Sequence, residues 1–155
     1  MTTRAILIAT STVLAAGALC AAQPAEDEKS KVTKKLIGAW QLQKGTVAGF
    51  DLPEPAAKAL SLELTNGKYL LKGAKAPDEG TWKIDVAKKP YAMDIKGENG
   101  PNKGKTMLCI FELDGDKLKV CYDMAGKKRP AKFESTKENK LFLADYKKVK
   151  KEEKE

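Results

Sequence analysis

The sequence predicts an all-β protein that folds as an eight-stranded antiparallel up-and-down barrel. Three observations favour this fold. Apolar residues alternate with polar residues at a period of two, the apolar runs are short, and turn residues separate them at fairly even spacing. Eight segments have this pattern, and most can join their sequence neighbours through short turns. Closure into a barrel would pair the edges that an open sheet exposes.

The expected strands are Ile37–Val47, Ser61–Thr65, Lys68–Lys72, Gly80–Asp85, Tyr91–Lys96, Lys105–Leu113, Lys117–Tyr122 and Leu141–Lys148. Residues 53–60 lack alternation and contain several Ala, which predicts a short helical segment at one barrel end. Asn66-Gly67 predicts a two-residue hairpin, because both residues tolerate the positive φ of a type I′ turn. The residues from Asp114 to Asp116 predict a similar turn between the sixth and seventh strands.

The first 22 residues predict a secretory signal peptide. A basic start at Arg4 precedes an apolar core and a small-residue exit. Cleavage after Ala22 would place the mature N-terminus at Gln23, so we expect an exported, periplasmic or extracellular protein without a transmembrane span. Lipid anchoring through Cys20 is the alternative, but Leu19 stands where acylation prefers a small residue.

The rest of the chain predicts one domain with a polar extension at each end. Residues 23–35 carry many charges and no periodic apolar residues, which is typical of a flexible tether. The barrel domain is expected over residues 36–148, a length that can bury one ordinary core. The charged residues 149–155 are expected to form a disordered tail.

The net charge of +8 raises the question of an anionic partner. The lysines are scattered among carboxylates and occupy alternate strand positions, as in the segment 117–120, which is typical of a barrel exterior in water. Nucleic-acid binders favour arginine interleaved with aromatic residues, yet Arg129 is the single arginine after the signal peptide. We therefore expect no nucleic-acid partner.

The sequence gives no support for catalysis. It contains no histidine, which excludes His-based triads, His-bearing zinc sites and an imidazole base. The three serines after the signal peptide lack a nucleophile-elbow context. The segment from Asp114 to Asp116 lacks the further oxygen ligands of a calcium loop. Asp85 and Asp94 could form an acid–base pair, but turn capping and surface pairing are commoner. We expect no enzyme activity, cofactor or metal.

Cys109 and Cys121 lie on neighbouring expected strands, and a three-residue turn would place them opposite each other. Alternation argues against a disulfide. Cys109 shares the apolar, inward face of its strand with Phe111, whereas Cys121 points to the outward face of its strand because its neighbour Val120 points inward. The three apolar side chains on the face of Val120, buried at about 1.5 to 3 kcal/mol each, contribute more to stability than the roughly 2 to 4 kcal/mol of a disulfide. We expect no bridge.

An eight-stranded barrel is just wide enough to be filled by side chains or to hold one small ligand. Alternation assigns an inward-facing set of residues, which comprises Trp40, Leu42, Leu62, Leu64, Tyr69, Leu71, Trp82, Ile84, Tyr91, Met93, Ile95, Met107, Phe111, Leu113, Leu118, Val120, Tyr122, Leu141 and Leu143.

Several ordered motifs resemble one protein family. A Gly-x-Trp strand start occurs at Gly38 and again at Gly80, and further motifs lie at residues 80–85, 88–90, 93–95, 110–118, 121–122 and 129–134. Together they resemble an uncharacterised family of small exported lipocalin-like domains that is abundant in planctomycete bacteria. The resemblance covers nearly all of residues 36–146. It implies a fold and an export route, and it brings no reaction, ligand or catalytic residue.

The resemblance also implies a closed-end clasp, in which Trp40 packs beneath a basic side chain. Arg129 or Lys147 is the expected cover. A cation over an indole ring contributes on the order of 0.5 to 2 kcal/mol.

Two functions follow from these observations. The first is an exported lipocalin-like protein that binds a small hydrophobic or amphipathic molecule inside the barrel. The expected lining is Tyr69, Trp82, Met93 and Tyr122. The alternative is an interaction module with a filled barrel, whose lysine-rich surface contacts anionic envelope polymers or a protein partner.

Overall fold

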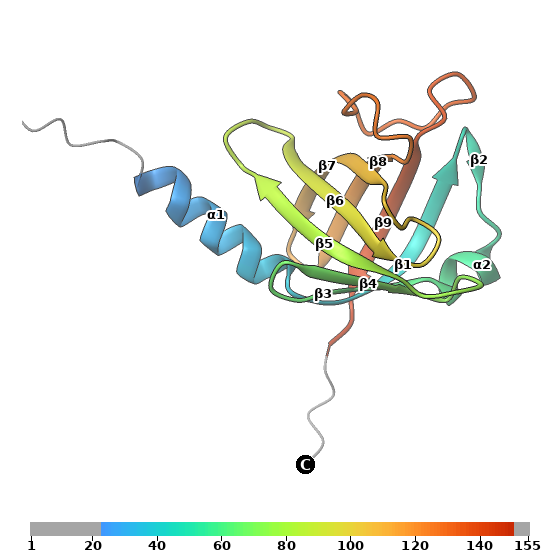
Figure 1. Ribbon diagram of the computed structural model, residues 1–155, viewed down its shortest axis with the longest axis horizontal. Coiled ribbons are helices and arrows are strands. Elements are labelled where there is room, and N and C mark those ends of the chain that lie inside the picture. Colours follow the sequence, from blue (N-terminus) through green and yellow to red (C-terminus); the bar gives the residue numbers. More distant parts are fainter. Residues whose placement is uncertain (1–22, 151–155) are drawn as a thin grey trace, which may run out of the picture.

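A computed structural model describes residues 23–150 and has the expected all-β fold (Figure 1). The strands are β1 (Gly38–Val47), β2 (Phe50–Asp51), β3 (Ser61–Leu64), β4 (Lys68–Lys72), β5 (Asp78–Asp85), β6 (Tyr91–Asn99), β7 (Thr106–Asp114), β8 (Lys117–Asp123) and β9 (Phe142–Lys148). Strand β1 pairs with both β3 and β9, so eight antiparallel strands close into an up-and-down barrel. The expected signal peptide, with Cys20, and residues 151–155 lie outside the described residues.

Two short elements follow β1. Strand β2 folds back on the end of β1, with Val47 opposite Phe50. The helix α2 (Glu54–Ala59) confirms the expected helical segment. The side-chain amide of Gln41 donates hydrogen bonds of 2.8 Å to the carbonyl oxygens of Lys58 and Leu60. These bonds hold the end of α2 against β1.

A helix replaces the flexible tether that the sequence analysis expected over residues 23–35. Helix α1 covers Gln23–Leu36 and extends away from the barrel (Figure 1). Two apolar residues four positions apart explain its attachment, since Val32 is 6 % exposed and Leu36 is fully buried. The Oη atom of Tyr91 on β6 also donates a 2.7 Å hydrogen bond to Glu28. This apolar pair is too short to produce a visible helical period in the sequence.

Both hairpin turns occur where they were expected, with different details. The nitrogen of Thr65 donates to the carbonyl oxygen of Lys68 across Asn66-Gly67. Only the glycine of that pair has a positive φ, of 74°, so the turn is not the expected type I′. Between β7 and β8, Asp114 pairs with Lys117. That turn therefore has two central residues rather than three.

The barrel core matches the expected inward-facing set from Trp40 to Tyr122, whose members are buried or packed against the core. The assignment for β9 was wrong, because Leu141 and Leu143 are absent from this cluster. Phe142 lies opposite Tyr122 in the register of β8 and β9, and their rings stack with centroids 5.4 Å apart. The inward-facing residues of β9 are Phe142, Ala144 and Tyr146.

The two cysteines lie on opposite faces of the sheet, as the alternation predicts. Cys109 belongs to the core and pairs with Tyr122, whereas Cys121 pairs with Ile110 and lies outside the core cluster. Both thiols are free.

Candidate functional site

All four residues that were expected to line an internal ligand site lie in the barrel core and are at most 6 % exposed. Trp82 is anchored by its ring nitrogen, which donates hydrogen bonds of 3.0 and 2.9 Å to the carbonyl oxygens of Thr65 and Lys68. Its indole therefore ties β5 to the β3–β4 turn.

The buried tyrosines are also engaged with protein atoms. Tyr69 donates a 3.1 Å hydrogen bond to Asp78, which accepts a second from the Asn102 side chain at 2.7 Å. The hydroxyls of Tyr122 and Tyr146 lie 3.1 Å apart. Burial raises the pKa of Tyr122 and brings the pKa of Tyr146 to about 12, so both are neutral at physiological pH. Within residues 23–150, no buried side-chain nitrogen or oxygen lacks a hydrogen-bond partner.

The expected clasp on Trp40 has a different cation. Trp40 is fully buried, and its ring nitrogen donates a 2.8 Å hydrogen bond to the carbonyl oxygen of Leu36. The Nζ atom of Lys148 lies 5.1 Å from the indole centroid. The prediction that Arg129 or Lys147 covers the Trp40 ring was therefore wrong. Lys148 lies opposite Trp40 in the pairing of β1 and β9, and opposed residues share a face.

Arg129 lies instead on the outer face of the barrel. Its Nη1 atom donates hydrogen bonds to the carbonyl oxygens of Met93 at 3.1 Å and Cys109 at 2.8 Å. Its Nη2 atom forms an ion pair with Asp94. Arg129 thus fastens the β8–β9 connection to two strands.

This connection forms a second layer over part of the sheet. Ile110 and Cys121 face outward, yet they are only 3 % and 0 % exposed. The Sγ atom of Cys121 donates to the carbonyl oxygen of Glu134 at 3.6 Å, and Pro130 is also buried. Residues 129–134 therefore cover an apolar patch outside the barrel.

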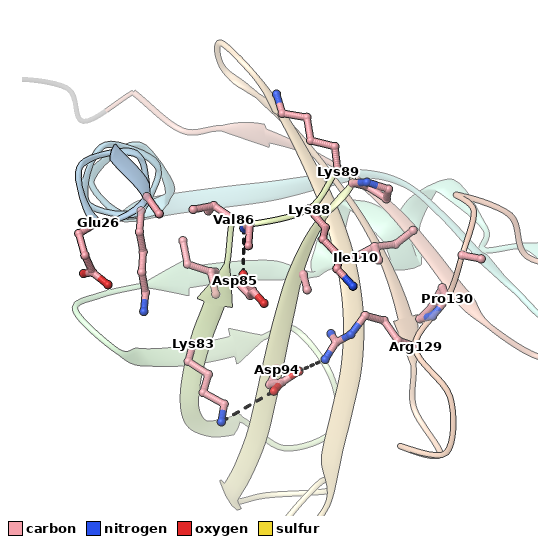
Figure 2. Close-up of a pocket in the computed structure, with 17 residues that line it drawn as sticks. Glu26, Lys83, Asp85, Val86, Lys88, Lys89, Asp94, Ile110, Arg129 and Pro130 are labelled. Atoms are coloured by element: carbon pink, nitrogen blue, oxygen red, sulfur yellow. Dashed lines mark hydrogen bonds and ion pairs between the residues drawn. The ribbon is translucent and has the colours of Figure 1, made fainter. Parts of the chain in front are cut away.

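A groove lies between this second layer and α1, on the outside of β5, β6 and β7 (Figure 2). Its volume is about 730 Å³. It is lined by Ala25, Glu26, Lys29, Lys83, Ile84, Asp85, Val86, Ala87, Lys88, Lys89, Pro90, Ala92, Asp94, Ile110, Arg129, Pro130 and Ala131. We call it the basic groove, because five of these residues are basic and three are acidic.

Some charged side chains of the basic groove form ion pairs with one another, and others do not. Asp94 is shared between Arg129 and Lys83, whose Nζ atom lies 3.8 Å from the carboxylate (Figure 2). By contrast, Lys29 and Lys88 form no ion pair with another described residue, and Lys89 lies over the Tyr91 ring at 5.0 Å. These three ammonium groups are available to a ligand.

A second hollow, of about 820 Å³, continues from the groove along the β8–β9 connection. The two hollows share Arg129, Pro130 and Ala131. The second adds the basic residues Lys127, Lys128, Lys132 and Lys140. Positive side chains thus line a continuous surface that is longer than either hollow alone.

Asp123 lies in this second hollow, where backbone hydrogen bonds stabilise its charged form. Its carboxylate accepts hydrogen bonds of 2.7 to 2.9 Å from the backbone nitrogens of Ala125, Lys127 and Lys128. Burial alone would raise the pKa of Asp123, but these bonds lower it below its ordinary value. The carboxylate therefore stays ionised at neutral pH, and its charge offsets part of the positive charge of the lysine side chains in this hollow.

The described residues offer no further chemical centre of the kinds considered above. Within residues 23–150, no group of acidic or cysteine side chains is arranged to hold a metal ion. None of the helices formed by these residues is long and apolar enough to cross a membrane. Comparison with models of known protein families, with curated proteins and with solved structures gave no match.

Sequence reasoning missed the basic groove. It assigned residues 23–35 to a tether and Arg129 to the barrel end, so neither wall of the groove was foreseen. The motif Lys88-Lys89-Pro90 belongs to the family resemblance, and its charge is typical of any barrel exterior, so the sequence does not mark it as part of a groove. The four-residue spacing of Val32 and Leu36 is compatible with a helix, but a single apolar pair does not by itself predict one.

Proposed function

We propose that this protein is a non-catalytic binding module that uses the basic groove outside its barrel to bind anionic polymers. The observation that carries the proposal is the groove itself, in which Lys29 and Lys88 line a hollow of about 730 Å³ without carboxylate partners. Lys89 also lines the hollow, and its side chain points away from Arg129 (Figure 2). We further propose that the protein is exported, so that acidic polymers of the cell envelope are the natural class of partner.

The charge in the groove favours an anion over a neutral ligand. Asp94 is already engaged by Arg129 and Lys83, and Asp85 accepts a 2.9 Å hydrogen bond from the backbone nitrogen of Ala87. Five basic side chains against three acidic ones, Glu26 included, leave the groove with an excess of two positive charges, which favours an anionic ligand. Individual surface charges contribute little, which makes several simultaneous contacts necessary.

The continuity of the two hollows favours a polymer over a small anion. A single phosphate or carboxylate could contact only part of the surface, and the described groove offers no enclosed anion pocket. A chain with repeated negative charges could pass from Lys88 along Arg129 to Lys132, contacting both hollows. Binding would then depend strongly on ionic strength, since each contact releases counterions.

A hydrophobic ligand inside the barrel receives less support from the same geometry. Trp82 and Tyr122 already have hydrogen-bond partners within the protein. The fully buried side chains of Trp40 and Phe111 occupy the interior as well. An eight-stranded barrel can be filled in this way, and a ligand would have to displace these side chains.

The test measures binding of the protein to polygalacturonate and to polyphosphate, which carry carboxylate and phosphate groups respectively, over a range of salt concentrations. The variant Lys88→Gln/Lys89→Gln removes two groove charges. Its matched control is Lys75→Gln/Lys103→Gln, because Lys75 and Lys103 are exposed loop lysines that line neither hollow. Trp82→Phe and a fluorescent lipophilic probe test the barrel interior in parallel.

We expect salt-sensitive binding to at least one polymer, at least about fivefold weaker in the groove variant, because two counterion-releasing contacts are lost. The control variant and Trp82→Phe should bind as the wild type does. Equal weakening in the groove and control variants would reduce the effect to net charge and overturn the proposal. Probe binding that is insensitive to salt and lost in Trp82→Phe would establish the interior site instead.

A further inference from the structure

Exposed apolar side chains gather at the end of the barrel where β2 and the β8–β9 connection lie. Phe50 is 62 % exposed, and Val47, directly opposite on β1, is 42 % exposed. Opposed residues share a face, so these two side chains form one apolar tip on the β1–β2 hairpin. Met124, which follows β8, is 38 % exposed.

The hairpin is held against the β8–β9 connection. The backbone nitrogen of Ala48 donates to the carbonyl oxygen of Leu141 at 3.0 Å, and that of Gly49 donates to the Ser135 hydroxyl at 3.1 Å. Figure 1 shows β2 and this connection rising at the same end of the molecule. The apolar tip is therefore fixed in position on the barrel.

The connection beside the tip is strongly basic. Residues 124–141 contain six basic and two acidic residues. The Nζ atom of Lys137 lies 5.0 Å from the centroid of the Phe50 ring, so a cation adjoins the most exposed aromatic side chain. The Asp51 carboxylate on the same hairpin is paired with Lys44 at 3.2 Å.

We propose that this end of the barrel docks on an anionic lipid bilayer. In this arrangement Phe50 and Val47 enter the interfacial layer of the bilayer, and the lysines of residues 124–141 lie among the anionic headgroups. Membrane association of this kind needs both an apolar insertion and electrostatic attraction, and the structure places both at one end. The docking surface shares the lysines of the second hollow with the proposed polymer-binding surface, but it excludes Lys29, Lys88 and Lys89 of the basic groove, which does not contain Phe50.

The charge of this surface and the small area of its apolar tip both favour a bilayer over a protein as the binding partner. Each lysine near an anionic membrane contributes about as much as a weak hydrogen bond, so several are needed beside a small apolar tip. Two or three exposed apolar side chains are far fewer than a stable protein–protein interface requires. A bilayer accepts such a tip, because it deforms around the inserted side chains.

The experiment measures co-sedimentation with vesicles of phosphatidylcholine, prepared with and without phosphatidylglycerol. Phe50→Ser removes the apolar tip, and Val149→Ser is the matched control, since Val149 is 47 % exposed beyond the opposite end of β9. Lys127→Gln/Lys128→Gln removes two charges from the docking surface. Thermal unfolding of each variant checks that the fold is retained, which the exposure of Phe50 favours.

We expect binding to the anionic vesicles alone, and about tenfold weaker binding for Phe50→Ser, given the apolar area of one aromatic side chain. The lysine variant should bind several times more weakly, and Val149→Ser should bind as the wild type does. A Phe50→Trp variant should also show a blue-shifted emission and quenching by brominated lipids on vesicle binding.

Three results would overturn the proposal. The first is absence of binding to anionic vesicles. The second is binding that Phe50→Ser leaves unchanged or that Val149→Ser weakens equally. The third is self-association of the wild type that Phe50→Ser abolishes, which would make a second copy the occupant of the tip. Lys88→Gln/Lys89→Gln separates the two proposals, because it should weaken polymer binding while leaving the vesicle-induced blue shift of the Phe50→Trp variant intact.

Discussion

The Nζ atom of Lys148 lies 5.1 Å from the indole centroid of Trp40 and also donates a 2.7 Å hydrogen bond to the carbonyl oxygen of Lys35. One lysine near the C-terminal end of β9 thereby joins the first barrel strand to the last turn of α1. Gly38 leaves room for this arrangement, since a Cβ atom there would lie 2.8 Å from Cε of Lys148.

Replacing Lys148 by Met should lower the free energy of unfolding by about 1 to 2 kcal/mol, because a cation–π contact and a hydrogen bond are lost. Lys147→Met is the matched control, since the neighbouring side chain is exposed. Urea denaturation followed by tryptophan fluorescence measures both variants. Equal stability of the two would contradict the role of Lys148 as the clasp.

Asp123→Asn should destabilise the protein in a pH-dependent way. The folded-state pKa of Asp123 lies below its ordinary value, so its stabilisation is fully present above the unfolded-state pKa of about 3.9. The stabilisation disappears as the pH falls through the folded-state pKa. We expect a loss of about 1.5 to 3 kcal/mol at neutral pH and a smaller difference from the wild type in acid.

Urea denaturation between neutral pH and about pH 3 tests this expectation. Asp116→Asn serves as the control, because the Asp116 side chain is exposed in a turn. A destabilisation by Asp123→Asn that stays constant across the whole range would show that packing, rather than the charged hydrogen bonds, is responsible.

Arg129→Ala should make the Cys121 thiol reactive while leaving Cys109 protected. Burial raises the pKa of both thiols, so neither should react readily in the native protein at neutral pH. Loss of the charged hydrogen bonds of Arg129 should raise the open population of residues 129–134 by roughly ten- to hundredfold. Arg129 contacts only the backbone carbonyl of Cys109, whereas the Cys109 thiol faces the barrel interior and should stay covered by the core.

Iodoacetamide labelling with mass-spectrometric mapping measures the two rates. Lys132→Ala is the control within the same segment, because its side chain is exposed. Faster labelling of Cys109 than of Cys121 in Arg129→Ala would mean that the barrel opens, and the second layer would then not be an independent unit.

Local sequence patterns predicted the barrel strands to within a few residues. Alternation is a property of neighbouring residues, and the turns at Asn66-Gly67 and near Gly115 interrupt it clearly. The core residues of β3 to β8 were predicted for the same reason, since the bulkier apolar residues of these strands alternate along the chain. The opposite faces of Cys109 and Cys121 also followed from alternation alone.

The sequence could not choose a face for β9, because Leu141 and Leu143 alternate with Phe142, Ala144 and Tyr146, and both sets contain bulky apolar residues. Pairing with β1 and β8 decided the choice, and it also placed Lys148 rather than Lys147 over Trp40. A one-residue shift of register reverses every side chain of a strand.

The all-β fold, the order of its strands and most of its core thus follow from the amino-acid sequence, because they arise from patterns among chain neighbours. The docking of α1, the position of Arg129 and the two surfaces proposed for binding became visible only in the folded molecule. Each of these depends on contacts between distant segments, such as Arg129 with Asp94 and Gly49 with Ser135, whose partners no local pattern specifies.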